Sequence, residues 1–582
     1  MANVNIKING RDYSVTKGIT ILAASHETQK LPQEFRQVQI PTLYYMKGVN
    51  DIDESGVCVA EADGVLVNAS TTRVKEGMEI ATMTEACVAA RKEALAAILA
   101  IHNKDCIHCF RSETCELQNL LHEYGFTNEP SLKDVDYSKI DTSSVVLIRD
   151  NNKCIKCKRC INVCAKMQAV SAIAATGKGL ETTIQPSSPA GLAAASCVNC
   201  GQCVAVCPVG ALYENGSTAA VKKAIADPEK YVVVQVAPAV RAALGETYEF
   251  PVGIDVEGRI AAALRELGFD KVFDTKFGAD LTIMEEANEL VDRIRNDGVL
   301  PMITSCCPGW VKYAEHFYPD MLDNLSSCKS PHTMFGAIVK SYFAEKTGIA
   351  KENIVVVSVM PCTAKKFEIT RDDEAGAGVP DVDFVITTNE LGKMLKEADI
   401  QLAAMPKEPF DEPLGEGSGA GVIFGTTGGV MEAALRTAVE RMTGEELPEV
   451  EFKEVRGLSG VKEAEYQVAG ETVKVAVASG LANANMLLTK VKAGEADYQF
   501  IEIMACPGGC VNGGGQPYQI APVQVNLNVT AERAAALYRN DASSKVRKSH
   551  ENPAIKALYA EYLSEPGSEK AHQLLHTTYA PR

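Results

Sequence analysis

Apolar and polar residues alternate at the start of the chain. Apolar side chains stand at every second position over residues 4–8, the pair Asn9-Gly10 interrupts the run, and the alternation resumes at Tyr13. An Asn-Gly pair between two alternating runs predicts a β-hairpin with a type I′ turn. A helix is expected to follow from about Ile19.

The pattern then changes along the chain. From 85 to 101 the apolar residues recur at helical spacing, which predicts an amphipathic helix. Beyond Gly216, nearly continuous apolar runs at 231–236 and 354–357 predict buried strands, and a helix is expected at about 259–267. This second half therefore has the composition of an α/β domain.

Length and charge set the broad class. A chain of 582 residues with 46% apolar composition is long enough for several cores, and we expect three to four domains. The net charge of −17 argues against a nucleic-acid-binding surface. The first residues show neither a basic leader nor a long apolar run, so no export signal or membrane span is expected, and the protein is predicted to be cytoplasmic.

The nineteen cysteines are tightly clustered, which in a reducing compartment indicates metal sites over disulfides. Two runs have the spacing C-x2-C-x2-C-x3-C, the bacterial two-cluster ferredoxin pattern, in which the fourth cysteine of each run binds the other cluster. We therefore predict one 4Fe4S cluster on Cys154, Cys157, Cys160 and Cys207. A second is predicted on Cys197, Cys200, Cys203 and Cys164.

A third group has the spacing H-x3-C-x2-C-x5-C and consists of His102, Cys106, Cys109 and Cys115. Zinc accepts the same donors and is the alternative reading. The segment resembles the His/Cys3 4Fe4S domain of hydrogenases and of respiratory-type enzyme subunits, and its place between ferredoxin modules favours iron.

Three further cysteine motifs lie far apart: TSCCPGW at 304–310, MPCTAKK at 360–366 and MACPGGCVNGGG at 504–515. Together they resemble the active-site signature of FeFe hydrogenases, a likeness that extends over 216–582 and includes FGAD, GVMEAALR and KSHEN segments. The resemblance implies reversible oxidation of dihydrogen to protons and electrons. It also implies an H-cluster, a 4Fe4S half joined to a diiron unit with CO, cyanide and a bridging azadithiolate.

Carried over residue by residue, the resemblance gives the 4Fe4S half of the H-cluster four ligands, Cys307, Cys362, Cys506 and Cys510, with Cys510 bridging to the diiron unit. Lys365 is expected to donate a charge-assisted hydrogen bond to cyanide, and backbone groups around Ala237 and Pro238 are expected to help hold it. Met360 and Met504 are expected beside the diiron unit. Ala239 stands where many family members have a serine whose hydroxyl donates to a cyanide, so altered redox tuning is expected there. His332 stands where glutamine is common.

Protons need titratable side chains or water to cross a dry pocket. The resemblance makes Cys306 the first relay group, followed by Glu286, Ser326, Glu289 and Arg293. Glu286 and Glu289 are spaced i, i+3 and so share one helix face. Without the resemblance, this pair would be read as part of a solvated face.

The N-terminal segment resembles the β-grasp fold of plant-type 2Fe2S ferredoxins. The four ligand positions of that family fall at Tyr44, Ser55, Cys58 and Ser70, of which only Cys58 is a cysteine. We therefore expect no 2Fe2S cluster, about 18 iron atoms in total, and an electron path that ends at the His102 cluster.

The predicted fold class is multidomain, α+β and α/β: a β-grasp ferredoxin-like domain (1–82), a His/Cys3 cluster domain (83–125), a two-4Fe4S ferredoxin-like domain (145–215) and an α/β FeFe hydrogenase catalytic domain with a small-subunit-like C-terminal segment (216–582). The expected electron partner is a ferredoxin or a dedicated subunit of a bifurcating or formate-linked complex. Two alternatives are a non-catalytic hydrogenase-like iron-sulfur protein, not expected to keep Cys306 and Lys365 together, and a hydrogen sensor, which typically lacks the relay cysteine.

Overall fold

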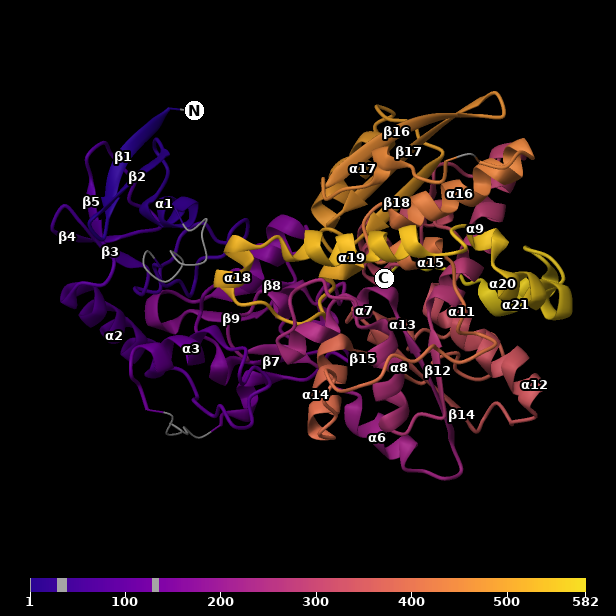
Figure 1. The fold of residues 1–582 in the computed structure, drawn as a ribbon, viewed down its shortest axis with the longest axis horizontal. Helices are drawn as coiled ribbons and strands as arrows, with labels where there is room; N and C mark the ends of the chain where they lie inside the picture. The colour runs from indigo at the N-terminus through magenta and orange to yellow at the C-terminus, as the bar shows by residue number, and fades with distance from the viewer. Residues whose placement is uncertain (1, 29–38, 128–134, 448) are drawn as a thin grey trace.

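The computed structural model describes residues 2–28, 39–127, 135–447 and 449–582. Figure 1 shows the N-terminal β-domain at one end of an elongated molecule, the large α/β domain at the other end, and the cysteine-rich segments between them. In the described part of the chain, every helix is too short or too polar to span a membrane.

The N-terminal domain is a five-stranded sheet in the order β2-β1-β5-β3-β4. Asn9 and Gly10 have positive φ angles of 50° and 80°, as a type I′ turn requires, so the predicted hairpin is confirmed. The expected helix begins two residues later than predicted. The elements are β1 (Asn3–Ile8), β2 (Arg11–Thr16), α1 (Ile21–Thr28), β3 (Val59–Ala62), β4 (Val65–Asn68) and β5 (Glu79–Ala81).

The cysteine-rich middle of the chain has little regular structure. The helix predicted from the 3.6-residue periodicity is present as α2 (Glu85–Leu99), and Thr84 caps its N-terminus. A three-stranded sheet, β10-β7-β6, and a hairpin, β8-β9, carry the cysteine loops. The other elements are α3 (Glu116–Glu123), β6 (Ile140–Asp141), β7 (Leu147–Asp150), α4 (Arg159–Asn162), β8 (Ile173–Thr176), β9 (Thr183–Pro186), α5 (Gln202–Ala205) and β10 (Leu212–Glu214).

Two four-stranded sheets form the core of the large domain. The first, β12-β11-β14-β15, is entirely parallel, and its strands are buried on both faces, which explains their continuous apolar sequence. The second, β13-β18-β17-β16, is parallel except for the β16–β17 pair. The strands are β11 (Tyr231–Val236), β12 (Lys271–Asp274), β13 (Met302–Ile303), β14 (Ile354–Met360), β15 (Phe384–Thr387), β16 (Val461–Val468), β17 (Glu471–Ser479) and β18 (Phe500–Met504).

Helices surround both sheets, and α9, which contacts α11, α15 and α16, is the longest described helix. Figure 1 shows α18 and α19 running from the large domain towards the cysteine-rich segments. The helices are α6 (Thr218–Ile225), α7 (Pro238–Arg241), α8 (Glu257–Glu266), α9 (Lys276–Arg295), α10 (Pro308–Phe317), α11 (Pro331–Ile338), α12 (Ala344–Thr347), α13 (Lys365–Glu368), α14 (Thr388–Glu397), α15 (Gly419–Ile423), α16 (Gly429–Thr443), α17 (Leu481–Lys492), α18 (Ala521–Asn526), α19 (Val529–Ser543), α20 (Pro553–Leu558) and α21 (Glu569–Leu575).

One buried ion pair joins all four predicted domains. The Arg159 guanidinium donates two hydrogen bonds to the Glu116 carboxylate, at 2.7 and 2.9 Å. It also donates to the carbonyl oxygens of Tyr45, at 2.8 Å, and Tyr44, at 3.3 Å, in the N-terminal domain. The Tyr518 hydroxyl, from the large domain, bonds to the same Glu116 carboxylate. The pair therefore fixes how the domains meet.

Candidate active site and electron-transfer sites

The three catalytic-type cysteine motifs follow the carboxyl ends of three strands. Cys362 comes directly after β14, Cys506 after β18, and the Cys306-Cys307 pair after β13. Because β13 and β18 are parallel neighbours and β14 belongs to the other sheet, the loops bring both sheets to one place. Ligand sites commonly form at the carboxyl ends of parallel strands.

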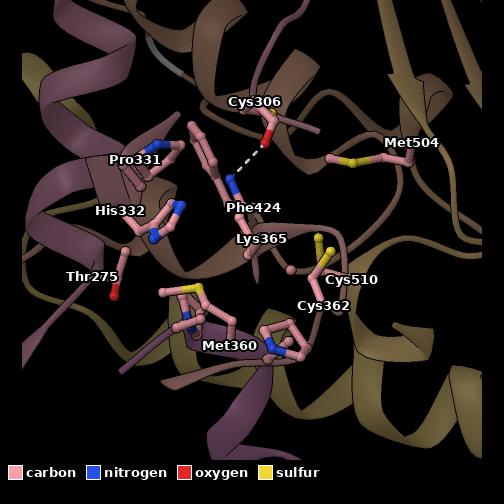
Figure 2. Close-up of a pocket in the computed structure, with 16 residues that line it drawn as sticks. Thr275, Cys306, Pro331, His332, Met360, Cys362, Lys365, Phe424, Met504 and Cys510 are labelled. Carbon is pink, nitrogen blue, oxygen red and sulfur yellow. Dashed lines mark hydrogen bonds between the residues drawn. The ribbon is translucent and has the colours of Figure 1, made fainter. Parts of the chain in front are cut away.

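These loops line a cavity of about 70 Å³. Figure 2 shows Cys362 and Cys510 side by side at one wall and Met360 and Met504 at separate points of the lining. The remaining walls are largely apolar, with contributions from Ala237, Pro238, Ala239 and Phe424. The predicted residues Ala237, Pro238, Met360 and Met504 therefore all line one dry pocket.

Two of the four predicted H-cluster cysteines, Cys362 and Cys510, line this cavity, and Cys307 and Cys506 lie near them. Burial raises the pKa of Cys362 to about 12, and the charge of Cys307 adds to the effect. Burial also raises the pKa of Cys506 well above its ordinary value, and the charges of Cys362 and Cys307 add to that effect. The Ala505 N–H lies 3.3 Å from the Cys307 sulfur. Crowded buried thiols are unfavourable as thiolates unless a cation holds them, so this donor set fits an iron-sulfur cluster.

Close backbone packing shapes the pocket. Gly509 has φ +95°, and a Cβ there would lie 2.5 Å from the Thr427 nitrogen. At Gly514 a Cβ would lie 2.6 Å from the Cα of Gly201 in the cysteine-rich domain. The glycines of the third motif are therefore needed for close approach of the backbone.

Lys365 is buried, and its ammonium group donates to the Glu368 carboxylate at 2.8 Å and to the Cys306 carbonyl at 3.1 Å, the bond drawn in Figure 2. Burial lowers the pKa of Lys365, but the charge and hydrogen bond of Glu368, together with the charges of Cys362 and Cys306, raise it overall. An ammonium group has three donors, so one is left for the cavity that Lys365 lines. The sequence did not single out Glu368; its i, i+3 spacing from Lys365 was the available signal.

His332 lines the same cavity and shares the Glu368 carboxylate. Its Nε2 lies 2.5 Å from Glu368 and its Nδ1 3.2 Å from the Ser358 hydroxyl. Burial, together with the Lys365 charge, lowers the pKa of His332 to about 4, so the ring is neutral at pH 7. Ala239, the second departure from the family pattern, contributes a methyl group to the lining and no hydroxyl.

The predicted relay residues run from the cavity towards the surface. Cys306 is buried at the cavity, Glu286 is fully buried on α9, and the Glu289 and Arg293 side chains are 15% and 14% exposed. The Ser326 hydroxyl donates to Glu289 at 2.8 Å, and Arg293 donates to Glu289 at 2.6 Å. The gradient of burial gives the chain a direction from the pocket to solvent.

Glu286 has unusual surroundings. Both of its carboxylate oxygens are buried without a hydrogen-bond partner among the described residues. Burial, with the Glu289 charge as the second cause, raises the pKa of Glu286 to about 8. A carboxyl group with such a pKa can accept and release a proton near neutral pH.

We predict that Glu286 is protonated below about pH 8. The stability gained from burying the neutral carboxyl is complete at acidic pH and is lost as the pH rises through about 8. An infrared carboxylic-acid band should disappear with that midpoint and be absent at every pH in Glu286→Gln. A wild-type protein without such a band at pH 6 would contradict this.

The ferredoxin-type cysteines form two groups. Cys164 lines one small cavity of about 20 Å³ with Cys197, Cys200 and Cys203, and we call this the second ferredoxin-type site. Cys154, Cys157, Cys160 and Cys207 form the first ferredoxin-type site, in which the pKa of Cys160 is raised to about 12 by burial, with contributions from Cys154 and Cys207. In each group, three cysteines of one run thus lie with the fourth cysteine of the other run, as the sequence pattern predicts.

The second ferredoxin-type site adjoins the active-site cavity. A Cβ at Gly309, beside Cys307, would lie 3.7 Å from the Cys200 Cβ. The Thr363 hydroxyl, beside Cys362, donates to the Asn199 carbonyl at 2.7 Å. Neighbouring loops of the two sites therefore pack directly on each other.

At the third group, the His102 Nδ1 lies 2.9 Å from the Lys153 carbonyl oxygen. A carbonyl can only accept, so Nδ1 carries the proton and Nε2 is left with its lone pair, the form in which imidazole binds a metal. The neighbouring Cys109 sulfur packs against Gly210, where a Cβ would lie 2.4 Å away. Lys153 precedes Cys154, so this group adjoins the first ferredoxin-type site.

Comparison with known proteins gives the family. Residues 230–514 match the family model for the iron only hydrogenase large subunit, C-terminal domain, and residues 527–582 match that for the iron hydrogenase small subunit. The whole chain is 46% identical over 596 residues to the NADP-reducing hydrogenase subunit HndD of Solidesulfovibrio fructosivorans, with both chains fully covered. The chain belongs to the iron-only (FeFe) hydrogenase family.

This hydrogenase is also 42% identical over 577 residues to iron hydrogenase 1 of Clostridium pasteurianum, with 99% of each chain covered. A solved structure of a variant of HydA1 from Chlamydomonas reinhardtii aligns with a TM-score of 0.56 at 47% identity, over 63% of this chain and 99% of that one. The aligned share indicates that the catalytic domain is common to both and that the accessory domains are additional here.

The accessory domains of the hydrogenase match three further families, two of them in the cysteine-rich middle of the chain and one at the N-terminus. Residues 91–130 match the iron-sulfur binding region of NADH-ubiquinone oxidoreductase-G, and residues 153–211 match the 4Fe-4S dicluster domain. The first match favours iron over zinc at His102. The predicted multidomain fold class is confirmed.

The expectation that the N-terminal domain has no 2Fe2S cluster is wrong. Residues 1–85 match the 2Fe-2S iron-sulfur cluster binding domain, and the chain aligns throughout with iron hydrogenase 1. The error came from weighing four aligned side chains, Tyr44, Ser55, Cys58 and Ser70, more heavily than the domain as a whole.

The loop that contains these positions has converging donors. The backbone N–H groups of Leu43, Tyr44 and Tyr45 all point to one oxygen of Asp53, at 2.7 to 3.0 Å. Here several backbone N–H groups surround one anionic carboxylate. The sulfur atoms of an iron-sulfur cluster are also surrounded by backbone N–H donors. The Cys58 thiol is fully buried nearby, and burial raises its pKa above the ordinary range.

Proposed function

We propose that this FeFe hydrogenase holds its H-cluster on Cys307, Cys362, Cys506 and Cys510 and there interconverts dihydrogen with two protons and two electrons. The observation that carries the proposal is that Cys362, Cys510, Lys365 and Cys306 line one apolar cavity, with Cys307 and Cys506 close to the two ligand thiols. When bound, the cofactor supplies the metal chemistry that cleaves or forms the H–H bond; the protein supplies placement, dryness and charge.

Each lining residue has a proposed task. Lys365 directs its third N–H towards the cavity and offers a charge-assisted bond to cyanide, while Glu368 keeps its charge in place. Met360 and Met504 provide polarizable contacts, and Ala237 and Pro238 line the same cavity. Water is excluded by the apolar walls, which strengthens each of these polar contacts.

Protons are proposed to pass between the cavity and solvent through Cys306, Glu286, Ser326 and Glu289. Burial and the Glu286 charge keep the pKa of Cys306 well above its ordinary value, so the thiol carries a proton. Glu286, with a pKa of about 8, is the exchanging group next in line. Arg293 is always charged, so its task is to position Glu289 at the surface end.

Electrons are proposed to move from the active site to the second and then the first ferredoxin-type site. From there one route leads to the His102 site, through the contact at Lys153. A second route leads to the N-terminal domain, where Tyr44 donates to the Ile155 carbonyl at 2.5 Å and Asn50 donates to the Cys157 carbonyl at 2.8 Å. The first ferredoxin-type site is thus a branch point.

A dedicated electron-transfer subunit or a ferredoxin is the proposed partner. The relative HndD is itself described as a subunit of an NADP-reducing hydrogenase, which favours the dedicated subunit. A cytoplasmic location is part of the proposal, because clustered cysteines that hold iron remain reduced there.

Iron analysis of the fully matured protein tests the cluster inventory. Three 4Fe4S clusters, one 2Fe2S cluster and a six-iron centre predict about 20 iron atoms per chain, together with hydrogen uptake and evolution. A matured protein with no hydrogen turnover and no cyanide or CO infrared bands would instead support the non-catalytic alternative.

Cys164→Ser is expected to remove or weaken the cluster of the second ferredoxin-type site, although Cys164 lies in the other run of the sequence. Its sulfur shares a cavity with Cys197, Cys200 and Cys203. Electron paramagnetic resonance (EPR) should show loss of one 4Fe4S signal, about four fewer iron atoms and slower electron transfer. Loss of the signal that Cys154→Ser also removes would contradict the crosswise assignment.

A further inference from the structure

The side chain of Arg149, on β7, enters the interior of the cysteine-rich domain and is only 1% exposed. Its Nε and Nη2 donate to the Ile184 carbonyl at 3.1 and 2.6 Å. Nη2 also donates to the Asn151 side chain at 2.5 Å and to the Cys154 sulfur at 3.8 Å. Nη1 is buried and has no hydrogen-bond partner among the described residues. The guanidinium thus has an unused donor beside cysteine sulfur.

The charge of Arg149 also has no carboxylate counter-ion in the described part of the chain. Asp141 lies opposite Arg149 in the β6–β7 ladder, but its carboxylate accepts the N–H groups of Ser143, at 2.9 Å, and Leu192, at 2.8 Å. Asp150, the neighbour in sequence, accepts the Asn152 N–H at 2.9 Å.

Arg91 and Arg111 are also buried, form no ion pair with a carboxylate of the described residues and donate to carbonyl oxygens, and the charge of Arg111 also acts on Cys207. Two other buried arginines are paired with carboxylates. Arg159 lies 2.7 Å from Glu116, and Arg241 lies 2.8 Å from Asp274. An isolated buried cation is strongly unfavourable, so Arg149 requires a nearby anion. Among the ranges that the structure describes, no carboxylate side chain supplies that anion.

The sulfur groups of the first ferredoxin-type site are the anions that Arg149 faces. Burial lowers the pKa of Arg149, and the charges of Cys160, Cys154 and Cys207 outweigh this and raise it. These are three of the four cysteines proposed to hold one cluster. A 4Fe4S cluster on four thiolates has a net negative charge, and that charge increases by one on reduction.

We propose that Arg149 is the counter-ion and hydrogen-bond donor of the cluster held by Cys154, Cys157, Cys160 and Cys207, and that it raises the reduction potential of that cluster. The inference rests on the proposed ligand set. A nearby cation stabilises the reduced, more negative form, and bonds to ligand sulfur act in the same direction. Arg149 is a positioning residue that acts on electron transfer at the branch point.

The test compares Arg149→Gln and Arg149→Lys in the full matured protein by EPR-monitored redox titration. Glutamine keeps a donor for the Ile184 carbonyl but removes the charge. At a fixed potential, we expect R149Q to lower the ratio of reduced to oxidised cluster by about tenfold or more. This corresponds to a fall in midpoint potential of about 59 mV or more. R149K should retain most of the wild-type potential, and the other clusters should titrate unchanged.

Arg11→Gln is the matched control, because Arg11 is an exposed arginine at the start of β2 and its loss changes the net charge equally. A wild-type midpoint in R149Q overturns the proposal. Failure of R149Q to load this cluster while R149K loads it supports the charge requirement. If neither R149Q nor R149K loads this cluster, the role of Arg149 is to hold the Ile184 carbonyl, and the proposal is overturned. Absence of this 4Fe4S signal from the wild-type protein would instead contradict the ligand assignment.

Discussion

Replacing Cys306 by alanine is expected to reduce hydrogen evolution and uptake by about 100-fold or more, the range over which positioned proton-transfer groups act. The Cys306 thiol lines the active-site cavity, and its backbone carbonyl is held by Lys365 at 3.1 Å. Burial and the charge of Glu286 keep the pKa of Cys306 high, so the thiol is a neutral proton carrier. Alanine has no exchangeable side-chain proton and leaves a gap between the cavity and Glu286.

Cys87→Ala is the matched control. Cys87 is equally buried, and its sulfur lies 3.7 Å from the Ala81 carbonyl, in the N-terminal part of the molecule. Both variants should have wild-type iron content, and only Cys306→Ala should lose turnover. Near-wild-type turnover in that variant would exclude the thiol from the proton path.

Replacing Arg159 by leucine is expected to destabilise the assembly of domains by about 3–5 kcal/mol, because it leaves the Glu116 carboxylate buried without its cation. The lost contacts are the two bonds to Glu116 and those to the Tyr44 and Tyr45 carbonyls. Glu116 is 5% exposed and cannot recover water without the domains separating.

Hydrogen exchange is the suitable measurement, since a multidomain metalloprotein does not unfold in one step. In Arg159→Leu, protection of backbone amides from exchange should fall where residues 43–55, α3 and α4 meet. It should fall less in the double variant Arg159→Leu/Glu116→Leu, which removes both charges. Lys222→Leu, which breaks the exposed pair between Lys222 and Glu397, should change stability by no more than about 1 kcal/mol. Equal effects of the exposed and buried substitutions would contradict this role for Arg159.

Local sequence pattern predicted those parts of the fold that depend on local geometry. The Asn9-Gly10 turn needs two residues with positive φ, and few other pairs adopt that conformation so readily. Strand β11 coincides with the predicted 231–236, where Lys230 precedes the β-branched run and Pro238 follows it closely. The first N-terminal helix begins at Ile21 and not at about Ile19, an error of the size expected where helix ends depend on the surrounding chain.

Motif spacing and resemblance predicted the candidate site residues, because cysteines that hold iron follow fixed spacing. What they could not provide is the surrounding charge. Glu368, which holds both Lys365 and His332, and Arg149, which faces ferredoxin-type cysteines, carry no motif of their own. Their roles depend on contacts between segments distant in sequence. The wrong expectation for the N-terminal cluster has the same origin, since it judged a folded loop by four isolated positions.

The contact between Gly514 and Gly201 sets a distance with main-chain atoms alone. At this point the main chains of the third active-site loop and the Cys200 loop touch, since a Cβ at Gly514 would lie 2.5 Å from the Cys200 carbonyl oxygen. The Gln202 side chain joins the same two loops by donating to the Asn512 carbonyl at 3.0 Å. Electron tunnelling falls off steeply with separation, so the spacing of the innermost pair of redox sites is as rigid as the backbone itself. Substitutions elsewhere can change redox potentials, partners and outer domains during evolution, while the speed of this one step is inherited with the fold.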